Sequence, residues 1–330
     1  MKIKINFNIK WIIFIALLIS IIVFPFYYQK RISTQNEKIK NISLILLNQS
    51  DDYWKNVKLG AETAAKEFDI KLNIVAPEDG GDITIQQNLI NEAVAMKVDA
   101  LLLVPSSFQE LVEPVEAAVN KGIIVMTVDS KVNTAKIACC IATDNLSAGK
   151  SAGEKLVSLA RMNSVAAIVG FDKKTGSNEF DRYKGIKEVT KDYKEIQVID
   201  RWCDIKDSNG AERIAKELIS NNEDISVIIA LNYKASIGVA RAIEKLGLKG
   251  KIKVVAFDGD YQEVKYMEDG TIQSVVIQSP FSMGYLAVKN AVLKLQGKSI
   301  PRYIESGFTV IDNDAIYLPE NQKILFPFTQ

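Results

Sequence analysis

Short apolar runs alternate with helical patterns along the chain from Asn41 onward. The first run, ISLILL at 42–47, lacks polar alternation, as a strand in a parallel sheet covered on both faces requires. A helical pattern at Tyr53–Phe68 follows, and further helical patterns separate the next runs, KLNIVA, ALLLVP and IIVMTVD. Strands and helices joined by short connections in this order are typical of a doubly wound α/β sheet.

The alternation starts again after a short predicted strand at Ala135–Ala142. The second series has apolar runs at 165–170, 196–202, 227–231, 253–258 and 274–280, followed by a long helix at Met283–Leu295. No linker rich in Pro, Gly or Ser separates the two series, which suggests that the chain passes directly between two lobes that share a cleft. The predicted fold class is therefore α/β, with two lobes built on parallel sheets.

A hydrophobic run at Trp11–Tyr28 precedes the first predicted strand, and a polar stretch at 29–40 reads as a stalk. A helix of this length rises about 27 Å, close to the roughly 30 Å hydrocarbon thickness of a bilayer. The following FPFYYQKRISTQNEK offers no small-residue cleavage site, and no cysteine for lipid attachment lies near. We expect an uncut transmembrane helix that holds the body at the cell membrane. A cleaved signal with an unusual site is the alternative. Positive charges flank both ends, so the positive-inside rule does not fix the orientation.

Composition excludes several classes of function. With 41 basic and 40 acidic residues and no basic block, nucleic acid is not an expected partner. The chain has no histidine, which removes the usual general base and the commonest metal ligand. It also lacks a phosphate-binding loop and a nucleophile elbow, so we expect neither an enzyme nor a cofactor.

The three cysteines are Cys139, Cys140 and Cys203. Their number and spacing fit neither a disulfide framework nor a zinc site. We expect them to be small buried hydrophobic residues, and we predict no metal site.

Polar and aromatic residues stand just beyond the predicted strand ends, where open parallel sheets bind their ligands. The candidates are Tyr53, Trp54, Asp129, Ser130, Arg182, Trp202, Asn232, Asp258 and Gln278. Carboxylates and amides pair with vicinal hydroxyls and aromatic faces stack on sugar rings, so the set indicates sugar binding. Each has a structural alternative. Tyr53, Trp54 and Trp202 could pack in a core, and Asp129 and Asp258 could cap turns.

Seven segments of the chain resemble the ribose-type periplasmic sugar-binding proteins, in the same order. They are NQSDDYWKNVKLGAETAAKEF, LLLVPSS, VMTVDS, CIATDNLSAGKSAGEKL, IALNYKASIGVARAIEKLG, VVAFDG and VVIQSP. The resemblance covers residues 41–310 and implies two Rossmann-like lobes joined by a three-crossover hinge. It places the first lobe at 41–143 plus 279–308, the second at 144–278 plus 309–330, and the anchor and stalk at 1–40.

The resemblance also implies roles for the candidate residues. Tyr53 and Trp54 match the stacking aromatic positions of the family, and Asp129 matches its hydroxyl-binding carboxylate. The remaining matches, in the second lobe, are Arg182, Asn232, Asp258 and Gln278. Ser130 departs from the pattern, because the family often has arginine there. The loop after Trp202 is longer than is typical, so the assignment of Trp202 rests on its strand end alone.

The combination of this body with a retained helix resembles membrane-tethered xylose-binding subunits of LytS-type sensor kinases. It implies that the body lies on the extracytoplasmic side of the cell membrane, that a monosaccharide closes the lobes and that closure signals to a membrane histidine kinase. The alternative partner is the permease of a sugar ABC importer. Related transcription factors would need an N-terminal helix-turn-helix, and an apolar run stands there instead. The sequence does not identify the sugar, although Ser130 favours a pentose such as xylose.

Overall fold

The computed structural model describes residues 40–78, 81–174, 176–205 and 207–325. The predicted transmembrane helix at Trp11–Tyr28 and most of the stalk lie outside these residues. Within the described ranges, no helix is both long enough and apolar enough to span a bilayer. The described chain contains two six-stranded sheets, ordered β11-β5-β4-β3-β1-β2 and β12-β10-β9-β8-β6-β7.

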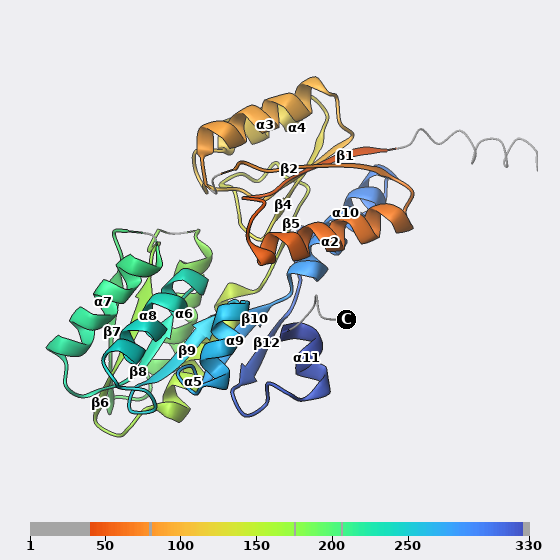
Figure 1. Cartoon of the computed structure of the whole chain (residues 1–330). Helices are drawn as coiled ribbons and strands as arrows, with labels where there is room; N and C mark the ends of the chain where they lie inside the picture. The colour runs from red at the N-terminus through yellow and green to blue at the C-terminus, as the bar shows by residue number, and fades with distance from the viewer. Residues whose placement is uncertain (1–39, 79–80, 175, 206, 326–330) are drawn as a thin grey trace, which may run out of the picture. The chain divides into compact units, whose positions relative to one another are not determined.

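The first sheet is entirely parallel. Its strands are β1 (Asn41–Ile45), β2 (Lys71–Val75), β3 (Ala100–Leu103), β4 (Ile124–Val128), β5 (Cys139–Ala142) and β11 (Tyr303–Glu305). Its helices are α2 (Asp52–Glu67), α3 (Ile83–Ala95), α4 (Val112–Asn120) and α10 (Pro280–Leu295). Figure 1 shows α2 and α10 on one face of this sheet and α3 and α4 on the other.

Burial on both faces explains the unbroken apolar runs of these strands. Along β1, Leu44 belongs to the core under α2 and α10, whereas its neighbour Ile45 belongs to the core under α3 and α4. Cys139 and Cys140 are both buried on β5, as their apolar context predicts.

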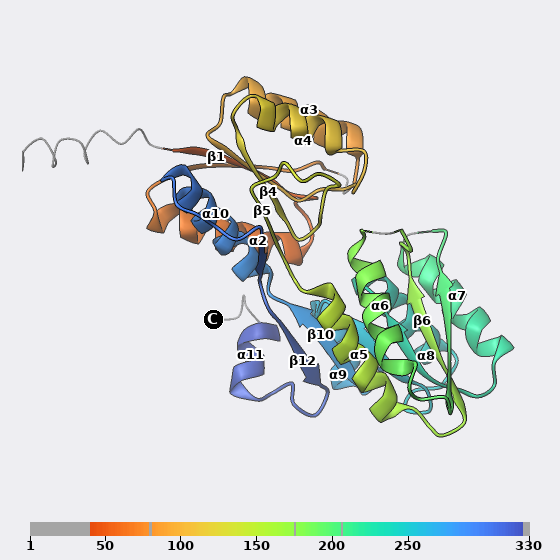
Figure 2. The same ribbon diagram turned by 180° about the vertical axis from the view of Figure 1, so that it is seen from behind.

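The second sheet is parallel except at one edge. Its strands are β6 (Ser164–Gly170), β7 (Ile196–Trp202), β8 (Ile225–Ala230), β9 (Lys253–Phe257), β10 (Ser274–Gln278) and β12 (Phe308–Asp312). Its helices are α5 (Asn145–Leu159), α6 (Asn178–Thr190), α7 (Ser208–Asn221), α8 (Tyr233–Lys245), α9 (Tyr261–Glu268) and α11 (Pro319–Leu325). Helices α5 and α6 cover one face, and α7 and α8 cover the other (Figures 1 and 2). The edge strand β12 runs antiparallel to β10, which the sequence analysis did not predict.

The chain crosses between the two sheets three times. The crossings lie between β5 and α5, between β10 and α10, and between β11 and β12. The prediction of two α/β lobes with mainly parallel sheets is therefore confirmed.

Helices α5 and α6 cross at very short range because glycines face the partner backbone. A Cβ placed on Gly149 would lie 2.1 Å from the carbonyl oxygen of Arg182, and one on Gly185 would lie 2.1 Å from that of Leu146. Only glycine fits such an approach. This crossing fixes where α6, and with it Arg182, sits against the second sheet.

Candidate functional site

Asp129 lies directly after β4 and has three hydrogen-bond donors around its carboxylate. The Tyr53 hydroxyl donates to Oδ1 at 2.7 Å, and the Ser130 hydroxyl donates to Oδ2 at 2.7 Å. The side-chain amide of Asn178 also donates to Oδ2, at 3.0 Å. Burial raises the pKa of Asp129, while the hydrogen bonds from Ser130 and Tyr53 oppose that rise.

Asp258 lies after β9 in the second lobe and is held by three groups. Its Oδ1 accepts from Gln278 Nε2 at 2.8 Å and lies 3.5 Å from Arg182 Nη1. Its Oδ2 accepts the backbone N–H of Tyr233 at 2.9 Å. The buried Oε1 of Gln278 has no hydrogen-bond partner among the described residues.

The two strand-end aspartates share an unusual backbone conformation. Asp129 has φ +67° and Asp258 has φ +99°, a region that L-residues other than glycine rarely occupy. Such strain persists where the surrounding structure enforces it, and it concentrates at binding and active sites. Asp69, Lys97 and Asn163 also have positive φ angles, but among these described residues only Asp129 and Asp258 directly follow a strand.

Arg182 is almost fully buried on α6, with 3% of its surface exposed. Its Nε donates to Asn145 Oδ1 at 2.8 Å, and its Nη1 donates to the Leu231 carbonyl at 2.7 Å. The guanidinium lies 4.4 Å from the centre of the Phe257 ring. These contacts fix the orientation of a cation beside Asp258.

The adjacent aromatics Tyr53 and Trp54 differ in their surroundings. Trp54 is buried in the core of the first lobe, as the inward-packing alternative describes, and only 7% of its surface is exposed. Tyr53 is partly buried, and its ring meets that of Trp54 edge-on at 4.7 Å. Burial, then Asp129 and Asp258, raise the pKa of Tyr53, while Arg182 lowers it. Tyr53 of the first lobe is thus within electrostatic reach of the second-lobe pair Arg182 and Asp258.

Asn232 both caps a helix and binds an acid that the sequence analysis did not single out. Its Oδ1 accepts from the N–H of Ala235 at the start of α8, and its Nδ2 donates to Glu179 Oε1 at 2.6 Å. The other Glu179 oxygen accepts the N–H groups of Phe171 and Asp172 at 2.6 and 3.2 Å. Burial raises the pKa of Glu179.

Trp202 at the end of β7 belongs to a polar and aromatic cluster. Its indole N–H donates to Asp200 at 2.6 Å, and the Tyr183 ring meets it edge-on at 5.6 Å. Lys173 lies over the indole with Nζ 5.7 Å from the ring centre, and Lys173 also pairs with Asp200 at 3.0 Å. These contacts occupy both the N–H and one face of Trp202.

The structure therefore brings together Tyr53, Asp129 and Ser130 from one lobe with Arg182, Asp258 and Gln278 from the other. Sequence reasoning missed Asn178 and Asn145, which bind Asp129 and Arg182 of this set. It also missed Glu179, which binds Asn232. Asn178 and Glu179 lie just before the candidate Arg182 in the sequence, so their position was a usable signal. The partner of each nevertheless depends on contacts that the sequence does not encode locally.

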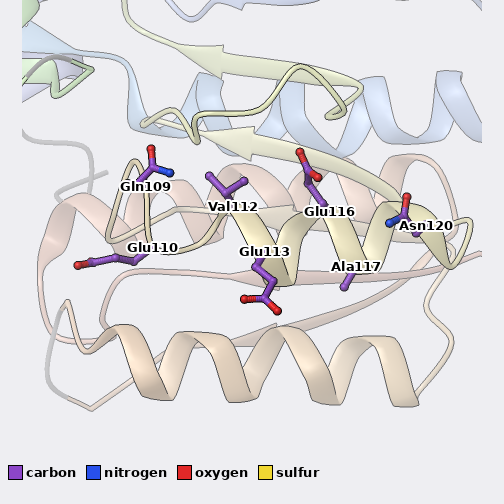
Figure 3. Close-up of a pocket in the computed structure, with 7 residues that line it drawn as sticks. All are labelled: Gln109, Glu110, Val112, Glu113, Glu116, Ala117 and Asn120. Atoms are coloured by element: carbon purple, nitrogen blue, oxygen red, sulfur yellow. The ribbon is translucent and has the colours of Figure 1, made fainter.

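The hollow along α4 is not this site. It has a volume of about 580 Å³ and runs from Gln109 to Asn120. Figure 3 shows Glu113 and Glu116 on different sides of the helix. Glu116 is already bound to Thr134 and Lys136, and no predicted site residue lines the hollow. The described residues also contain no group of three potential metal ligands.

The chain is similar to known sugar-binding proteins over most of its length. Residues 42–299 match the family model of the periplasmic binding protein domain. The chain is 26% identical over 291 residues to the D-allose-binding periplasmic protein of Escherichia coli (strain K12), covering 86% of this chain and 93% of that protein. It is also 26% identical over 271 residues to the D-xylose-binding periplasmic protein of the same organism, covering 74% and 81%.

Among solved structures, the chain is similar to an ABC transporter solute-binding protein from Agrobacterium vitis bound with alpha-D-tagatopyranose. The TM-score is 0.81 at 27% identity, and the match covers 87% of this chain and 99% of that one. This similarity extends over both lobes of the described fold.

Proposed function

Because the chain belongs to the periplasmic binding protein domain family, we propose that it binds a monosaccharide between its two lobes. The observation that carries the proposal is the pair of strained, strand-end aspartates, Asp129 and Asp258, one from each lobe. Family membership also confirms that the chain is a binding component rather than an enzyme.

The chemistry of the proposed site suits a polyhydroxylated ring. Each carboxylate can accept hydrogen bonds from hydroxyls, and a charged acceptor makes these bonds stronger than neutral ones. Arg182 and Gln278 hold Asp258 in place. The Oε1 of Gln278, which has no partner in the described part of the chain, is an additional acceptor beside it. Tyr53 contributes an aromatic ring next to Asp129.

The ligand that we favour is a pentose such as xylose. Ser130 is short and its hydroxyl already binds Asp129, so it does not extend a cationic head toward the ligand as arginine would. The similarity to a D-xylose-binding periplasmic protein supports the same choice. Asn232 and Trp202 complete the proposed ligand set. The Asn232 amide has a second N–H besides the one that binds Glu179, and Trp202 lies at the end of β7.

We further propose that the segment Trp11–Tyr28 anchors the body outside the cell membrane and that lobe closure signals to a sensor histidine kinase. The support for the membrane anchor is the apolar run without a recognisable cleavage site. The second candidate is the binding component of a sugar ABC importer, which the similarity to an ABC transporter solute-binding protein favours. Affinity purification from detergent-solubilised membranes separates them, because one candidate retains a kinase and the other a permease.

Calorimetry and thermal unfolding of residues 41–330 with xylose, ribose, allose and arabinose test the ligand. A sugar that binds only the folded state stabilises it by about 2.7 kcal/mol at a hundredfold excess over Kd. We expect xylose to raise Tm most, and Asp129→Asn to remove the shift. Failure of all four sugars to bind or to raise Tm would contradict the proposal.

A further inference from the structure

The start of α6 contacts the first lobe at three places. The amide of Asn178 donates to Asp129 Oδ2 at 3.0 Å and lies 3.3 Å from both the Asp129 carbonyl and Ser130 Oγ. Lys131 Nζ pairs with Asp181 Oδ2 at 3.1 Å. A Cβ on Gly176 would lie 2.8 Å from the Phe108 ring, so this ring packs on the Gly176 backbone. We call Gly176, Asn178 and Asp181 with these contacts the α6 clasp.

The clasp uses an acceptor that a sugar needs. Tyr53 and Ser130 hold Asp129 from within its own lobe, whereas Asn178 reaches the same carboxylate from the second lobe. A hydroxyl that binds Oδ2 from between the lobes must take the place of the Asn178 amide, because Ser130 already fills the other approach. A sugar that binds Oδ2 therefore competes with the clasp for this oxygen atom.

We propose that Asn178 sets the sugar affinity by competing with the sugar for Asp129, because its amide holds the carboxylate until a sugar hydroxyl replaces it. This inference rests on the proposed sugar site. When only a fraction of the protein molecules is competent to bind sugar, the apparent Kd equals the intrinsic Kd divided by that fraction. The affinity is thus lowered by the stability of the clasp, and the clasp selects ligands whose hydroxyls replace its hydrogen bond.

The contacts of the clasp differ in how much they stabilise it. The Lys131–Asp181 pair is 40% and 22% exposed at its two side chains, and exposed pairs contribute little net stability. The Asn178 bond joins an amide to a buried carboxylate, and bonds to charged groups are the stronger kind. We therefore assign most of the effect of the clasp on sugar affinity to Asn178.

Titration calorimetry and stopped-flow binding of xylose to the Asn178→Ala variant test the competition. We expect Kd to fall about tenfold, mainly through faster association, because the variant no longer occupies Asp129. Lys131→Met should change Kd less than twofold. Asn209→Ala, an exposed asparagine in the first turn of α7, is the matched control and should leave Kd unchanged. An unchanged or higher Kd in Asn178→Ala would overturn the inference, the latter because it would place Asn178 on the bound sugar.

A ligand-free measurement separates the clasp from the sugar site. Spin labels on Glu92→Cys and Glu217→Cys report the distance between the lobes, and both positions are exposed while the native cysteines are buried. We expect a longer or broader distance distribution in ligand-free Asn178→Ala than in its parent. Identical ligand-free distributions would overturn the clasp. A shifted distribution in a protein that binds none of the sugars would instead overturn the proposed function, and the competition with it, while leaving the clasp contacts in place.

Discussion

At the scale of single residues, the proposed site depends on acidic residues that the fold holds in strained or buried positions. Asp129 and Asp258 carry positive φ angles, and Asp129 and Glu179 are buried enough to raise their pKa values. Their positions after strands were predictable from the sequence, because apolar runs end at VMTVD and VVAFD. Their backbone strain and their hydrogen-bond partners could not be predicted from the sequence, because both depend on the loops that pack around these residues.

Asp258→Asn should weaken sugar binding about ten- to a hundredfold without unfolding the protein. The amide removes a charged acceptor, and hydrogen bonds to charged groups contribute about 1.5–3 kcal/mol. Calorimetry with the sugar that stabilises the parent measures the loss. Asp269→Asn, at the C-terminal end of α9, is the control and should bind normally. Parental affinity in Asp258→Asn would remove this carboxylate from the site.

Glu263 makes a pH-dependent contribution to stability. It is fully buried, and its Oε2 accepts the N–H groups of Gly259 and Asp260 at 2.7 and 2.8 Å. Burial, with the nearby Asp258 as second cause, raises the pKa of Glu263 well above 4.5. An acid whose pKa is raised on folding stabilises the protein fully only below its unfolded-state pKa. That stability is lost as pH rises through the folded-state pKa.

Glu263→Gln should therefore become more stable relative to the parent as pH rises above about 4.5, by up to about 1.4 kcal/mol per pH unit. Urea unfolding at several pH values between 4 and 8 measures the difference. Glu92→Gln, on the exposed face of α3, should show no such trend. A difference that stays flat across this range would mean that Glu263 is ionised in the folded protein.

At the scale of elements, strand and helix periodicity predicted most of both lobes. It missed α9, β11, the edge strand β12 and α11, and the omissions of α9 and β12 each have a physical reason. Helix α9 has eight residues with a mixed pattern and is specified by its capping box, Asp260 with Glu263. Strand β12 follows its partner β10 only after the whole of α10 and β11, so its antiparallel pairing is a long-range choice.

Gly149→Ala should lower both stability and sugar affinity. Its methyl group would overlap the Arg182 backbone, so α6 must move away from α5 and take Arg182 with it. Overpacking of this kind costs about 1–3 kcal/mol. Thermal unfolding and calorimetry measure the two effects, and Glu154→Ala on the exposed side of α5 serves as the control. Reduced stability with parental sugar affinity would show that the crossing does not position Arg182.

At the scale of the whole molecule, the candidate site is assembled from both lobes, while the proposed anchor lies apart from it in sequence. No predicted site residue precedes Tyr53, so ligand recognition belongs to the body. The identity of the family was readable from ordered segments such as TDN and FDG, and the family match covers residues 42–299. The output of binding is not encoded in these segments, because it depends on the protein that contacts the lobes.

Deleting residues 1–40 should leave sugar affinity unchanged and release the protein from membranes. Full-length protein should remain in the membrane fraction after a high-salt wash, because salt screens charges but does not extract an apolar segment. Immunoblotting of the fractions and calorimetry of the truncated protein are the measurements. A soluble mature chain beginning near Lys30 would favour a cleaved signal and the importer.

The three crossings also determine the order in which the protein can fold during synthesis. Helix α10, which packs on α2, and strand β11, which completes the first sheet, come from residues made after the entire β6–β10 series. Until α10 leaves the ribosome, the apolar sheet face that contains Leu44, Leu102 and Met126 lacks one of its two covering helices. Partly covered apolar surface makes nascent chains prone to aggregate. The first lobe, although it begins the chain, therefore cannot be the first to finish folding, and its synthesis creates a period in which chaperones have a surface to bind.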